Sequence, residues 1–309
     1  MILKNVLVVY YTQSGQLLDI AKNITNELES SKDVNLNFYE IKLKENFPFP
    51  WNKSNFYDAF PESFLQIPTA LTDLDNPLLK QKYDLVIVAY QVWYLSPAIP
   101  INSFLKNKIA KQLLSNTPVI TVIGCRNMWV MAQEKMKKLL ADNGANLVGH
   151  ISLFDRHPNH ISVITIFDWA FSGIKKRFLG IFPKPGVSDD DIENSKRFSS
   201  DILEALKSGK YADLQDALLK KGAVVIKPFL IVTDKRAQII FDKWSAFVYK
   251  KGKAKDPKRQ LRLQMFSYYL MFAIWVIAPI VFIVYLLTYV FTFNSRKRDK
   301  YYYSHTKLK

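Results

Sequence analysis

Residues 263–295 contain no Asp, Glu, Lys or Arg, and this uncharged run limits the fold more than any other feature. Helices of soluble domains average about 11–12 residues, so a buried core helix of this length is not expected. A bilayer core needs about 20 apolar residues in a helix, and the run is long enough to cross with some tilt. Tyr268, Tyr269 and Tyr289 lie near its ends, where aromatic belts form. We therefore expect one transmembrane helix over about residues 265–293, with Pro279 leaving a re-entrant hairpin as the alternative.

The positive charge of the chain is concentrated around this run. The net charge is +16, but residues 1–155 are nearly neutral, whereas residues 250–309 hold 13 Lys or Arg and two acids, Asp256 and Asp299. Basic clusters beside a hydrophobic span attract anionic lipid headgroups. The charge therefore indicates membrane lipids as a partner, and nucleic-acid binding is not expected. Seven basic residues precede the run and six follow it, which slightly favours a cytoplasmic location for the large domain.

Cysteine usage and the N-terminus restrict the chain further. Cys125 is the only cysteine, so neither an intramolecular disulfide nor a cysteine-based metal cage can form. We expect no metal site. The opening residues, MILKNVLVVYYTQSGQ, lack a cationic region followed by a cleavage site, so a signal peptide is not expected.

Apolar runs alternate with helical patterns in the first half of the chain, which is typical of an α/β fold with a parallel sheet. Strands are expected over residues 6–11, 34–41, 84–90, 118–124 and 146–154, and helices over residues 15–30, 98–110 and 129–142. The pattern predicts a doubly wound domain with a five-stranded parallel sheet over residues 1–155. A helical extension over residues 156–249 and a basic-flanked membrane anchor over residues 250–309 complete the predicted organisation.

Two segments depart from this rhythm. Residues 44–68 are rich in proline and aromatic residues, whereas a plain linker is polar, so we interpret them as an insertion folded over another part of the molecule. The insertion covers either a substrate site or a purely structural surface. Residues 161–182 are mostly apolar, with a basic cluster at Lys175, Lys176 and Arg177. They indicate either a helix packed on the sheet or an amphipathic helix lying on a bilayer.

The strongest local motif lies between the first strand and the first helix. Its residues are Thr12, Gln13, Ser14, Gly15 and Gln16. Phosphate binding needs backbone N–H groups at a helix N-terminus, hydroxyl donors and a glycine that permits close approach, and all three are present. Doubly wound folds also bind ligands at this edge of the sheet. The motif matches neither a Walker A loop nor G-x-G-x-x-G, and the simpler interpretation is that Ser14 only caps a helix.

Two later loops leave the same predicted edge. One follows the third strand and the other follows the fourth; their candidate residues are Gln91, Val92, Trp93 and Tyr94, and Gly124, Arg126 and Asn127. A planar heteroaromatic ring binds between apolar or aromatic faces with a few polar contacts at its edge. Trp93 and Tyr94 offer faces, and Arg126 and Asn127 offer edge contacts. The alternative is that these aromatic residues only pack the end of the sheet.

The first 155 residues resemble the flavodoxin-like FMN-binding superfamily. TQSGQ is close to the usual Thr/Ser-x-Thr/Ser-Gly loop that grips the FMN phosphate, with Gln16 in place of the common final hydroxyl residue. WYLSP looks like the corresponding loop of NAD(P)H-dependent flavin and quinone reductases. The chain looks most like the bacterial dialkylresorcinol-condensing enzymes. This narrower resemblance is carried jointly by TQSGQLLDIAKNI, GCRNMW and the basic hydrophobic tail. The resemblance implies FMN as cofactor, a homodimer, and an aromatising oxidation of a lipid-chain cyclic ketone.

Proton transfer in such an oxidation needs a base or a group that stabilises an enolate. His157 and Tyr94 are the candidate bases, although a histidine in a surface loop is usually only solvated. Arg126 is the candidate for stabilising an anionic flavin or enolate. His157 and His160 have the H-x-x-H spacing, but no third metal ligand is evident.

The expected function is that of a membrane-anchored FMN-dependent oxidoreductase acting on a lipophilic cyclic ketone or quinone-like substrate. One alternative is an NAD(P)H-dependent quinone or flavin reductase. A second is a membrane-tethered flavodoxin that only carries electrons, and a third is a binding module that has lost its flavin. A near-neutral domain favours the enzymes, because carrier flavodoxins are typically acidic.

Overall fold

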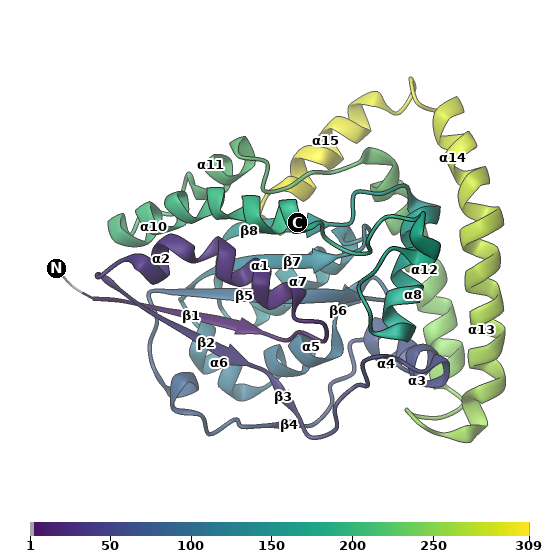
Figure 1. The fold of residues 1–309 in the computed structure, drawn as a ribbon, viewed down its shortest axis with the longest axis horizontal. Coiled ribbons are helices and arrows are strands. Elements are labelled where there is room, and N and C mark those ends of the chain that lie inside the picture. The colour runs from purple at the N-terminus through teal and green to yellow at the C-terminus, as the bar shows by residue number, and fades with distance from the viewer. Residues whose placement is uncertain (1–2, 309) are drawn as a thin grey trace.

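A parallel sheet forms the centre of the molecule. A computed structural model describes residues 3–308. The long strands are β1 (Lys4–Tyr10), β2 (Val34–Glu40), β5 (Leu85–Trp93), β7 (Pro118–Cys125) and β8 (Asn146–Phe154). They lie in the order β2-β1-β5-β7-β8, and every neighbouring pair is parallel (Figure 1). This is the flavodoxin-like order of a doubly wound fold, in which the order reverses between β1 and β5. The five predicted strands are confirmed.

Successive side chains of the strands enter two separate cores, because a strand directs neighbouring residues to opposite faces. Leu7 and Val9 pack with α5 (Ile99–Leu105), α6 (Lys108–Leu114) and α7 (Val130–Asp142). Val6 and Val8 pack with α1 (Gln16–Ile24) and α2 (Asn26–Ser30) on the other face. All four strand residues are fully buried, which explains why the strands have no polar alternation.

Two of the predicted helices are each divided in two. The helix expected over residues 15–30 breaks at Thr25, whose hydroxyl donates to the carbonyls of Ala21 and Lys22. A hydroxyl bonded to the preceding turn competes with regular helical geometry. The helix expected over residues 98–110 breaks before α6, where the Asn107 side chain accepts from the Ile109 N–H at 3.0 Å. The prediction of one continuous helix was wrong in both places.

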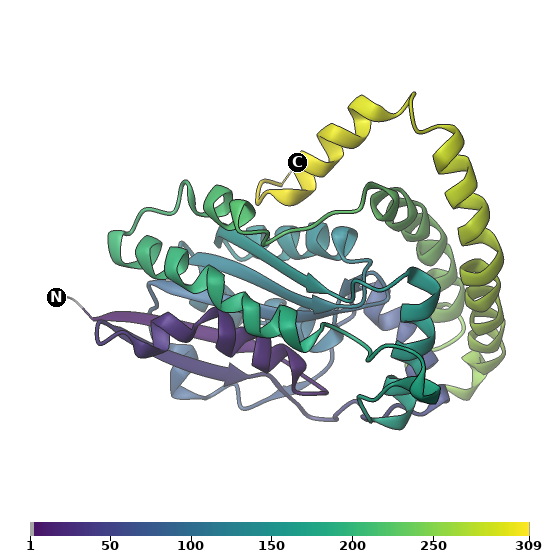
Figure 2. The same cartoon turned by 45° about the horizontal axis from the view of Figure 1, so that its top comes forward.

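Much of the region after β8 belongs to the core of the sheet. It contains α8 (Asn159–Ser172), η2 (Phe178–Gly180), α9 (Asp189–Glu193), η3 (Asn194–Phe198), α10 (Ser199–Ser208) and α11 (Leu214–Lys220). Phe198, Ile202 and Leu218 are fully buried against the face that α1 also covers. Figure 2 shows α10 running along the sheet, where it lies beside α2. Residues 187–223 therefore complete the helical layer that α1 and α2 begin on this face of the sheet.

The insertion after β2 is folded and structured. It begins at β3 (Lys42–Leu43), continues through α3 (Lys53–Asp58) and α4 (Phe60–Phe64), and returns at β4 (Leu71–Thr72), which pairs with β3. A short turn, η1 (Pro77–Lys80), leads into β5, and β6 (Ser96–Pro97) folds back on the end of β5. Phe60 and Phe64 are buried in a separate small core that they share with Phe241 and Phe266 from the later helices.

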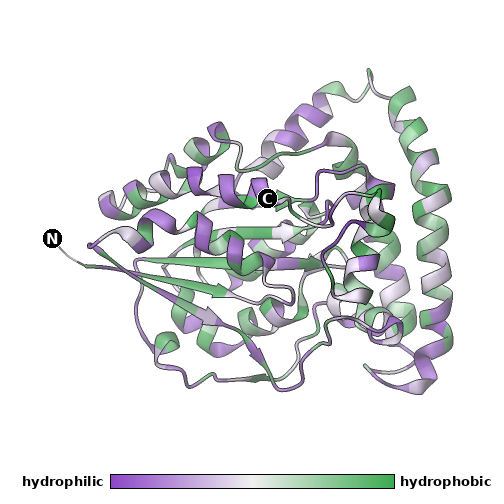
Figure 3. Cartoon of the chain, in the orientation of Figure 1, coloured by the Kyte–Doolittle hydropathy of each residue, from purple (hydrophilic) through white to green (hydrophobic). Residues whose placement is uncertain are grey.

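The uncharged run forms a long helix at one side of the molecule. After α12 (Pro228–Tyr249), the chain runs through η4 (Pro257–Arg259), α13 (Gln260–Phe272), a π-helical turn η5 (Ala273–Ile277) and α14 (Ala278–Leu287). The continuous stretch Pro257–Leu287 is long and apolar enough to cross a membrane by length and composition, and its most apolar window has no buried residue. Figure 3 shows α14 as mainly hydrophobic. α15 (Phe293–Ser304) then turns back towards the sheet (Figure 1).

Candidate functional site

A cavity of about 400 Å³ lies at the carboxyl ends of β1, β5 and β7. It falls beside the reversal in strand order, where doubly wound sheets bind their ligands. A volume of this size is within the usual range of small-molecule sites. Ten of the residues named from the sequence line it: Gln13, Ser14, Gln16, Gln91, Val92, Trp93, Tyr94, Gly124, Arg126 and Asn127. The sheet therefore brings the three predicted loops together around one cavity.

The first loop has the backbone of an anion site. Gly15 has φ 83° and immediately precedes α1, and a side chain added there would meet no atom within 4 Å. The Thr12 hydroxyl accepts the Gly15 N–H at 3.1 Å, which holds the loop in a tight turn. The N–H groups in the first turn of α1 have no partner within the helix. They are suited to bind a phosphate, although Thr12 and Gly15 do not themselves line the cavity.

Gln16 joins this loop to a distant segment. Its side-chain amide donates to the Val187 carbonyl at 3.0 Å and accepts the Val187 N–H at 3.1 Å. Gly186 has φ 79°, and a Cβ there would come within 2.9 Å of the Gln16 side chain. The residue that departs from the usual phosphate-loop pattern therefore fastens the loop to residues 186–187.

A smaller polar hollow of about 280 Å³ adjoins the same loop. Ser14 and Gln16 line both hollows, and Lys175 lines the smaller one. The Lys175 ammonium pairs with Asp189 at 2.7 Å and remains partly exposed. Lys175 belongs to the basic cluster of residues 175–177, for which the sequence left bilayer contact as one of two alternatives. The structure places its charge beside Ser14 and Gln16 of the first loop.

The WYLSP loop is a two-residue hairpin turn in an unusual conformation. Tyr94 and Leu95 have φ values of 47° and 60°, between the paired residues Trp93 and Ser96. Two positive φ values describe a type I′ turn, which glycine and asparagine normally occupy. Burial raises the pKa of the Tyr94 hydroxyl well above its usual value, and this hydroxyl donates to the Phe56 carbonyl at 2.5 Å. Tyr94 thus contributes a ring to the cavity wall, while its proton is held by the insertion.

The aromatic insertion forms a wall of the cavity. Phe49, Trp51 and Phe56 all line it. The Trp51 ring packs edge to face against Trp93 at 5.4 Å between centroids, and its indole N–H donates to the Gln13 side chain at 3.3 Å. The interpretation of residues 44–68 as a segment folded over another part of the molecule is confirmed, because the insertion contacts two of the predicted loops.

Arg126 and Asn127 are held by Asn159, which no sequence pattern singles out. The Asn159 side-chain oxygen accepts from Arg126 at 2.9 Å and from Asn127 at 3.0 Å, and Asn159 itself lines the cavity. Burial lowers the pKa of the Arg126 guanidinium to about 10, with Asp155 opposing the shift. Arg126 still carries its charge at neutral pH, so the cavity contains a fixed positive group.

The donors and acceptors around the cavity match a flavin. Gln91 Oε1 and Asn127 Oδ1 are buried and have no hydrogen-bond partner among the described residues. Both residues line the cavity beside aromatic walls, and an isoalloxazine ring has polar groups along one edge and apolar faces. Gly124 permits close packing here, since a Cβ would lie 3.1 Å from Leu17 and Ile20 side chains. The residues present therefore fit FMN.

The two histidines after β8 have different surroundings. His157 does not line the cavity; its backbone N–H donates to Asp155 at 3.0 Å. His160 donates from Nε2 to the Ile274 carbonyl at 3.0 Å and lies 5.0 Å from the Trp275 ring. Pro279 has no N–H to reach that carbonyl, so His160 supplies the donor that the π-helical turn lacks. His160 therefore contacts the long apolar helix, whose Ile274 lines the cavity.

The far wall of the cavity is apolar and belongs to later helices. Its residues from α8 are Val163, Ile166, Phe167, Trp169 and Ala170, and those from the long apolar helix are Leu270, Ala273, Ile274 and Ala278. The expectation that residues 161–182 form one helix was wrong beyond Gly173, where α8 ends in a left-handed residue.

The described residues contain no group of three or more potential ligands that could hold a metal ion.

Asp234, on α12, is a buried acid next to this site. One of its carboxylate oxygens accepts the Met131 N–H at 3.0 Å at the start of α7, and the other has no partner among the described residues. Burial raises the pKa of the carboxyl group to about 7, partly offset by the Met131 N–H and by Lys135. The folded protein therefore holds this proton more tightly than the unfolded chain does.

Asp234→Asn is expected to change how stability depends on pH. Because the pKa of Asp234 is raised in the folded state, its contribution to the stability of the fold is most favourable below about pH 4. That contribution declines as the pH rises to about 7. From pH 4 to pH 8 the variant should gain stability relative to the parent, by up to about 4 kcal/mol. Urea unfolding at both pH values measures this change. If the free energies of unfolding of the variant and the parent differed by the same amount at pH 4 and pH 8, Asp234 would ionise in the folded protein as freely as in the unfolded chain.

Comparison with known proteins gives likenesses to flavoproteins of low overall similarity. No family model and no curated protein sequence matches this chain. A flavoprotein from Lactobacillus acidophilus NCFM, solved in complex with FMN, is 22% identical over 48% of this chain and 93% of its own, with a TM-score of 0.37. Oxidised flavodoxin 1 from Bacillus cereus is 12% identical over 65% of this chain and 97% of its own, with a TM-score of 0.35. The strand order, rather than these likenesses, identifies the fold class.

Proposed function

We propose that this protein is a membrane-associated, FMN-dependent oxidoreductase that acts on a lipophilic cyclic ketone or quinone-like molecule. The observation that carries the proposal is the single cavity that joins the phosphate loop, the aromatic walls and the long apolar helix. When bound, FMN would supply hydride or electron transfer, and the protein would supply orientation and charge. The first-loop backbone would hold the phosphate, while Trp93, Tyr94 and Asn127 would hold the ring.

The polar and apolar walls of the cavity support different parts of the proposal. Arg126 places a buried positive charge where an anionic flavin or enolate would be stabilised. The wall formed by Ile166, Phe167 and Leu270 has no charged group and suits a hydrocarbon chain. The aromatising oxidation of a dialkyl cyclic ketone to a resorcinol, which the sequence resemblance implies, has a substrate of this kind.

The aromatic wall of the cavity favours an enzyme over an electron carrier. The insertion places Trp51 and Phe56 against the aromatic loop that would flank the flavin. A carrier passes electrons to a protein partner through an accessible flavin edge, whereas aromatic walls beside the flavin give a small apolar substrate a surface to bind. An NAD(P)H-dependent quinone reductase uses the same cavity and differs in its electron donor, which a reduction assay identifies.

Absorbance of the detergent-purified protein tests the proposed function. Bound oxidised flavin should give bands near about 370 and 450 nm. Under anaerobic conditions, dialkyl cyclohexane-1,3-diones, which become resorcinols on losing two hydrogens, should bleach these bands faster as their chains lengthen, by at most about fourfold for each fully buried methylene. Bleaching by NADPH, with no response to the ketone, would instead identify the reductase. A protein that neither contains FMN nor takes it up would contradict the proposal.

Ile283→Lys is expected to weaken membrane association. Ile283 lies on α14 with 57% of its surface exposed, and a lysine inside a membrane helix costs about 2.5–3.5 kcal/mol at the helix centre. Partition into liposomes of mixed neutral and anionic phospholipid should fall by up to roughly 60- to 300-fold, as flotation measures. Leu3→Lys is the control, because Leu3 has similar exposure, 53%, and directly precedes β1, which starts at the side of the molecule away from α14 (Figure 1). Equal flotation of the two variants would exclude α14 as the lipid contact.

A further inference from the structure

One face of the long apolar helix packs along the globular domain. Residues with reduced exposure recur at helical spacing; they are Leu263, Phe266, Leu270, Ile274, Ile277, Val281 and Tyr285. Phe266 stacks on Phe60 of the insertion at 3.7 Å between ring centroids. Trp244 lies 5.2 Å from Tyr269, and Phe229 lies 5.4 Å from Tyr285. α12 therefore runs antiparallel beside α13 and α14 from one end to the other (Figure 1).

The opposite face of this helix is exposed and apolar. Its exposed residues are Met265, Tyr268, Phe272, Trp275, Val276, Ile280, Phe282, Ile283, Val284, Leu286 and Leu287. A soluble helix has charged residues on such a face, and none occurs here. The contiguous apolar surface therefore needs an apolar environment.

Both ends of the helix are attached to the same domain. Before α13, the Arg259 guanidinium pairs with Asp58 at 2.8 Å and with Glu62 at 2.6 Å. After α14, Asp299 of α15 pairs with Lys235 of α12 at 2.7 Å, and the ring of Tyr303 enters the core beneath the sheet.

The last residues of the chain continue this attachment. Gln215 donates to the Ser304 carbonyl at 2.8 Å, and the buried Lys137 donates to the Lys307 carbonyl at 3.1 Å. The two flanks of the apolar helix are thus fixed to α7, α11, α12 and the insertion.

These attachments conflict with the single span expected from the sequence. A spanning helix separates its flanks by about 30 Å of hydrocarbon, whereas here both flanks bind one domain. It would also draw the adjoining α12 into the hydrocarbon, together with the exposed charges of Arg236, Asp242 and Lys243. A helix lying on its side needs only about 10–12 Å of depth, which one leaflet of about 15 Å provides.

We propose that α13 and α14 lie in the plane of the membrane, sunk sideways into one leaflet of anionic phospholipid. This inference rests on the membrane association proposed above. Both flanks remain on the side of the domain, where the exposed basic residues Lys250, Lys253, Lys297 and Arg298 contact anionic headgroups. Ala273 and Ala278 line the cavity from the same helix, so only one helix separates the cavity from the lipid.

Cysteine labelling of the full-length protein tests this arrangement. Lys253→Cys and Lys297→Cys place a thiol on each exposed flank, and Lys82→Cys marks the side of the globular domain. The parent is the blank, because its one cysteine, Cys125, lies in the cavity wall and burial raises the pKa of its thiol. Each variant is treated with a membrane-impermeant maleimide in sealed inverted and right-side-out vesicles of the expression host.

All three variants should react from the same side, with rates in the two vesicle types differing at least tenfold in the same direction. If the Lys297→Cys variant reacted from the side opposite to the Lys82→Cys variant, the helix would be a single span and the in-plane arrangement would be overturned. Labelling of either flank only after detergent is added would also overturn it. Flotation separates the two proposals: a protein that does not float contradicts membrane association itself, whereas one that floats with opposite-sided flanks contradicts only the in-plane arrangement.

Discussion

Gly15→Val is expected to remove most of the bound FMN. Gly15 has φ 83° directly before α1, a conformation in which a β-branched residue is a severe outlier. Left-handed backbone costs an ordinary residue about 1–2 kcal/mol, so the valine variant will rearrange the loop. The N–H groups of the first helical turn would then no longer converge on one anion, and FMN affinity should fall roughly 10- to 100-fold. The ratio of absorbance at about 450 nm to protein absorbance, with FMN titration of the apoprotein, measures the loss.

Gly209→Val is the matched control for this effect. Gly209 has φ 67° at the end of α10, and a Cβ there would also meet no atom within 4 Å. The Gly209→Val substitution therefore introduces similar backbone strain outside the cavity, so the Gly15 and Gly209 variants should lose similar stability. Only the Gly15 variant should lose flavin. Equal flavin content in the two variants would show that the TQSGQ loop does not hold the phosphate, and Ser14→Ala would then have no reason to weaken binding.

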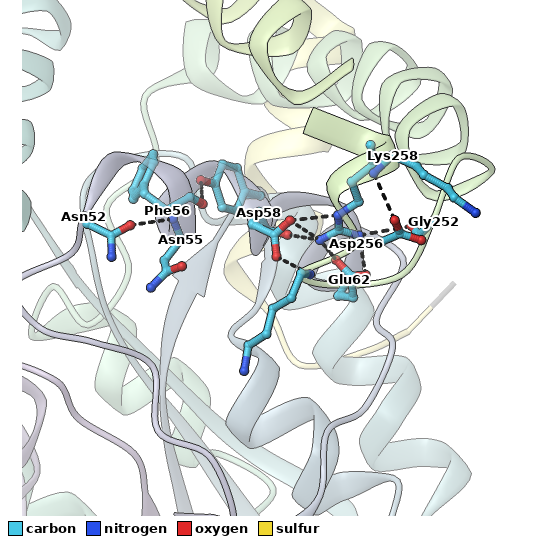
Figure 4. Close-up of polar contacts among 11 residues, drawn as sticks. Asn52, Asn55, Phe56, Asp58, Glu62, Gly252, Asp256 and Lys258 are labelled. Atoms are coloured by element: carbon cyan, nitrogen blue, oxygen red, sulfur yellow. Dashed lines mark hydrogen bonds and ion pairs between the residues drawn. The ribbon is translucent and has the colours of Figure 1, made fainter. Parts of the chain in front are cut away.

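Arg259→Met is expected to destabilise the fold by about 3–5 kcal/mol, because it leaves buried carboxylates without their partner. The Arg259 side chain is fully buried, and its guanidinium contacts Asp58, Glu62 and the Gly252 carbonyl. Figure 4 shows Asp58 and Glu62 directed towards this common centre beside Gly252. The melting temperature should fall by roughly 5–10 °C, since each kcal/mol corresponds to a few degrees in a chain of this size. Thermal unfolding and urea titration in detergent measure the change.

Lys255→Met provides a nearby comparison. Lys255 pairs with Glu45, but both side chains are more than 70% exposed. Exposed pairs contribute little, so this variant should unfold at the same urea concentration and temperature as the parent. If Arg259→Met were no more destabilising than Lys255→Met, Asp58 and Glu62 would have to reach water when unpaired. Arg259 would then not be the attachment of the apolar helix to the insertion.

The parallel sheet and the loops at its edge could be predicted from the sequence, because their signals are local. Val6 to Val9 form an uninterrupted apolar run, as a strand buried on both faces requires. The Gly15 loop follows this strand directly, and parallel strands bring their carboxyl ends to one edge. Trp93 and Arg126 therefore reach the same cavity although neither is near Gly15 in sequence. Chain order and strand direction were sufficient to predict that these loops meet at one edge of the sheet.

Breaks within helices and contacts made by the later segments could not be predicted. The divisions at Thr25 and Asn107 depend on single side-chain hydrogen bonds, which periodicity does not detect. Asn159 has no distinguishing pattern in the sequence and gains its role only where α8 passes Arg126 and Asn127. Gln16 binds Val187 across 171 residues, and no local signal reports a contact of that range.

For the apolar run, sequence and tertiary structure each determined a different property. Its length and lack of charge determined a helix long and apolar enough to cross a membrane, since hydrophobicity and helical length are properties of the segment alone. The orientation of this helix relative to the globular domain depended on where the segments before and after it bind. Arg259 before it and Tyr303 after it both attach to the globular domain, and only the tertiary structure brings those partners together.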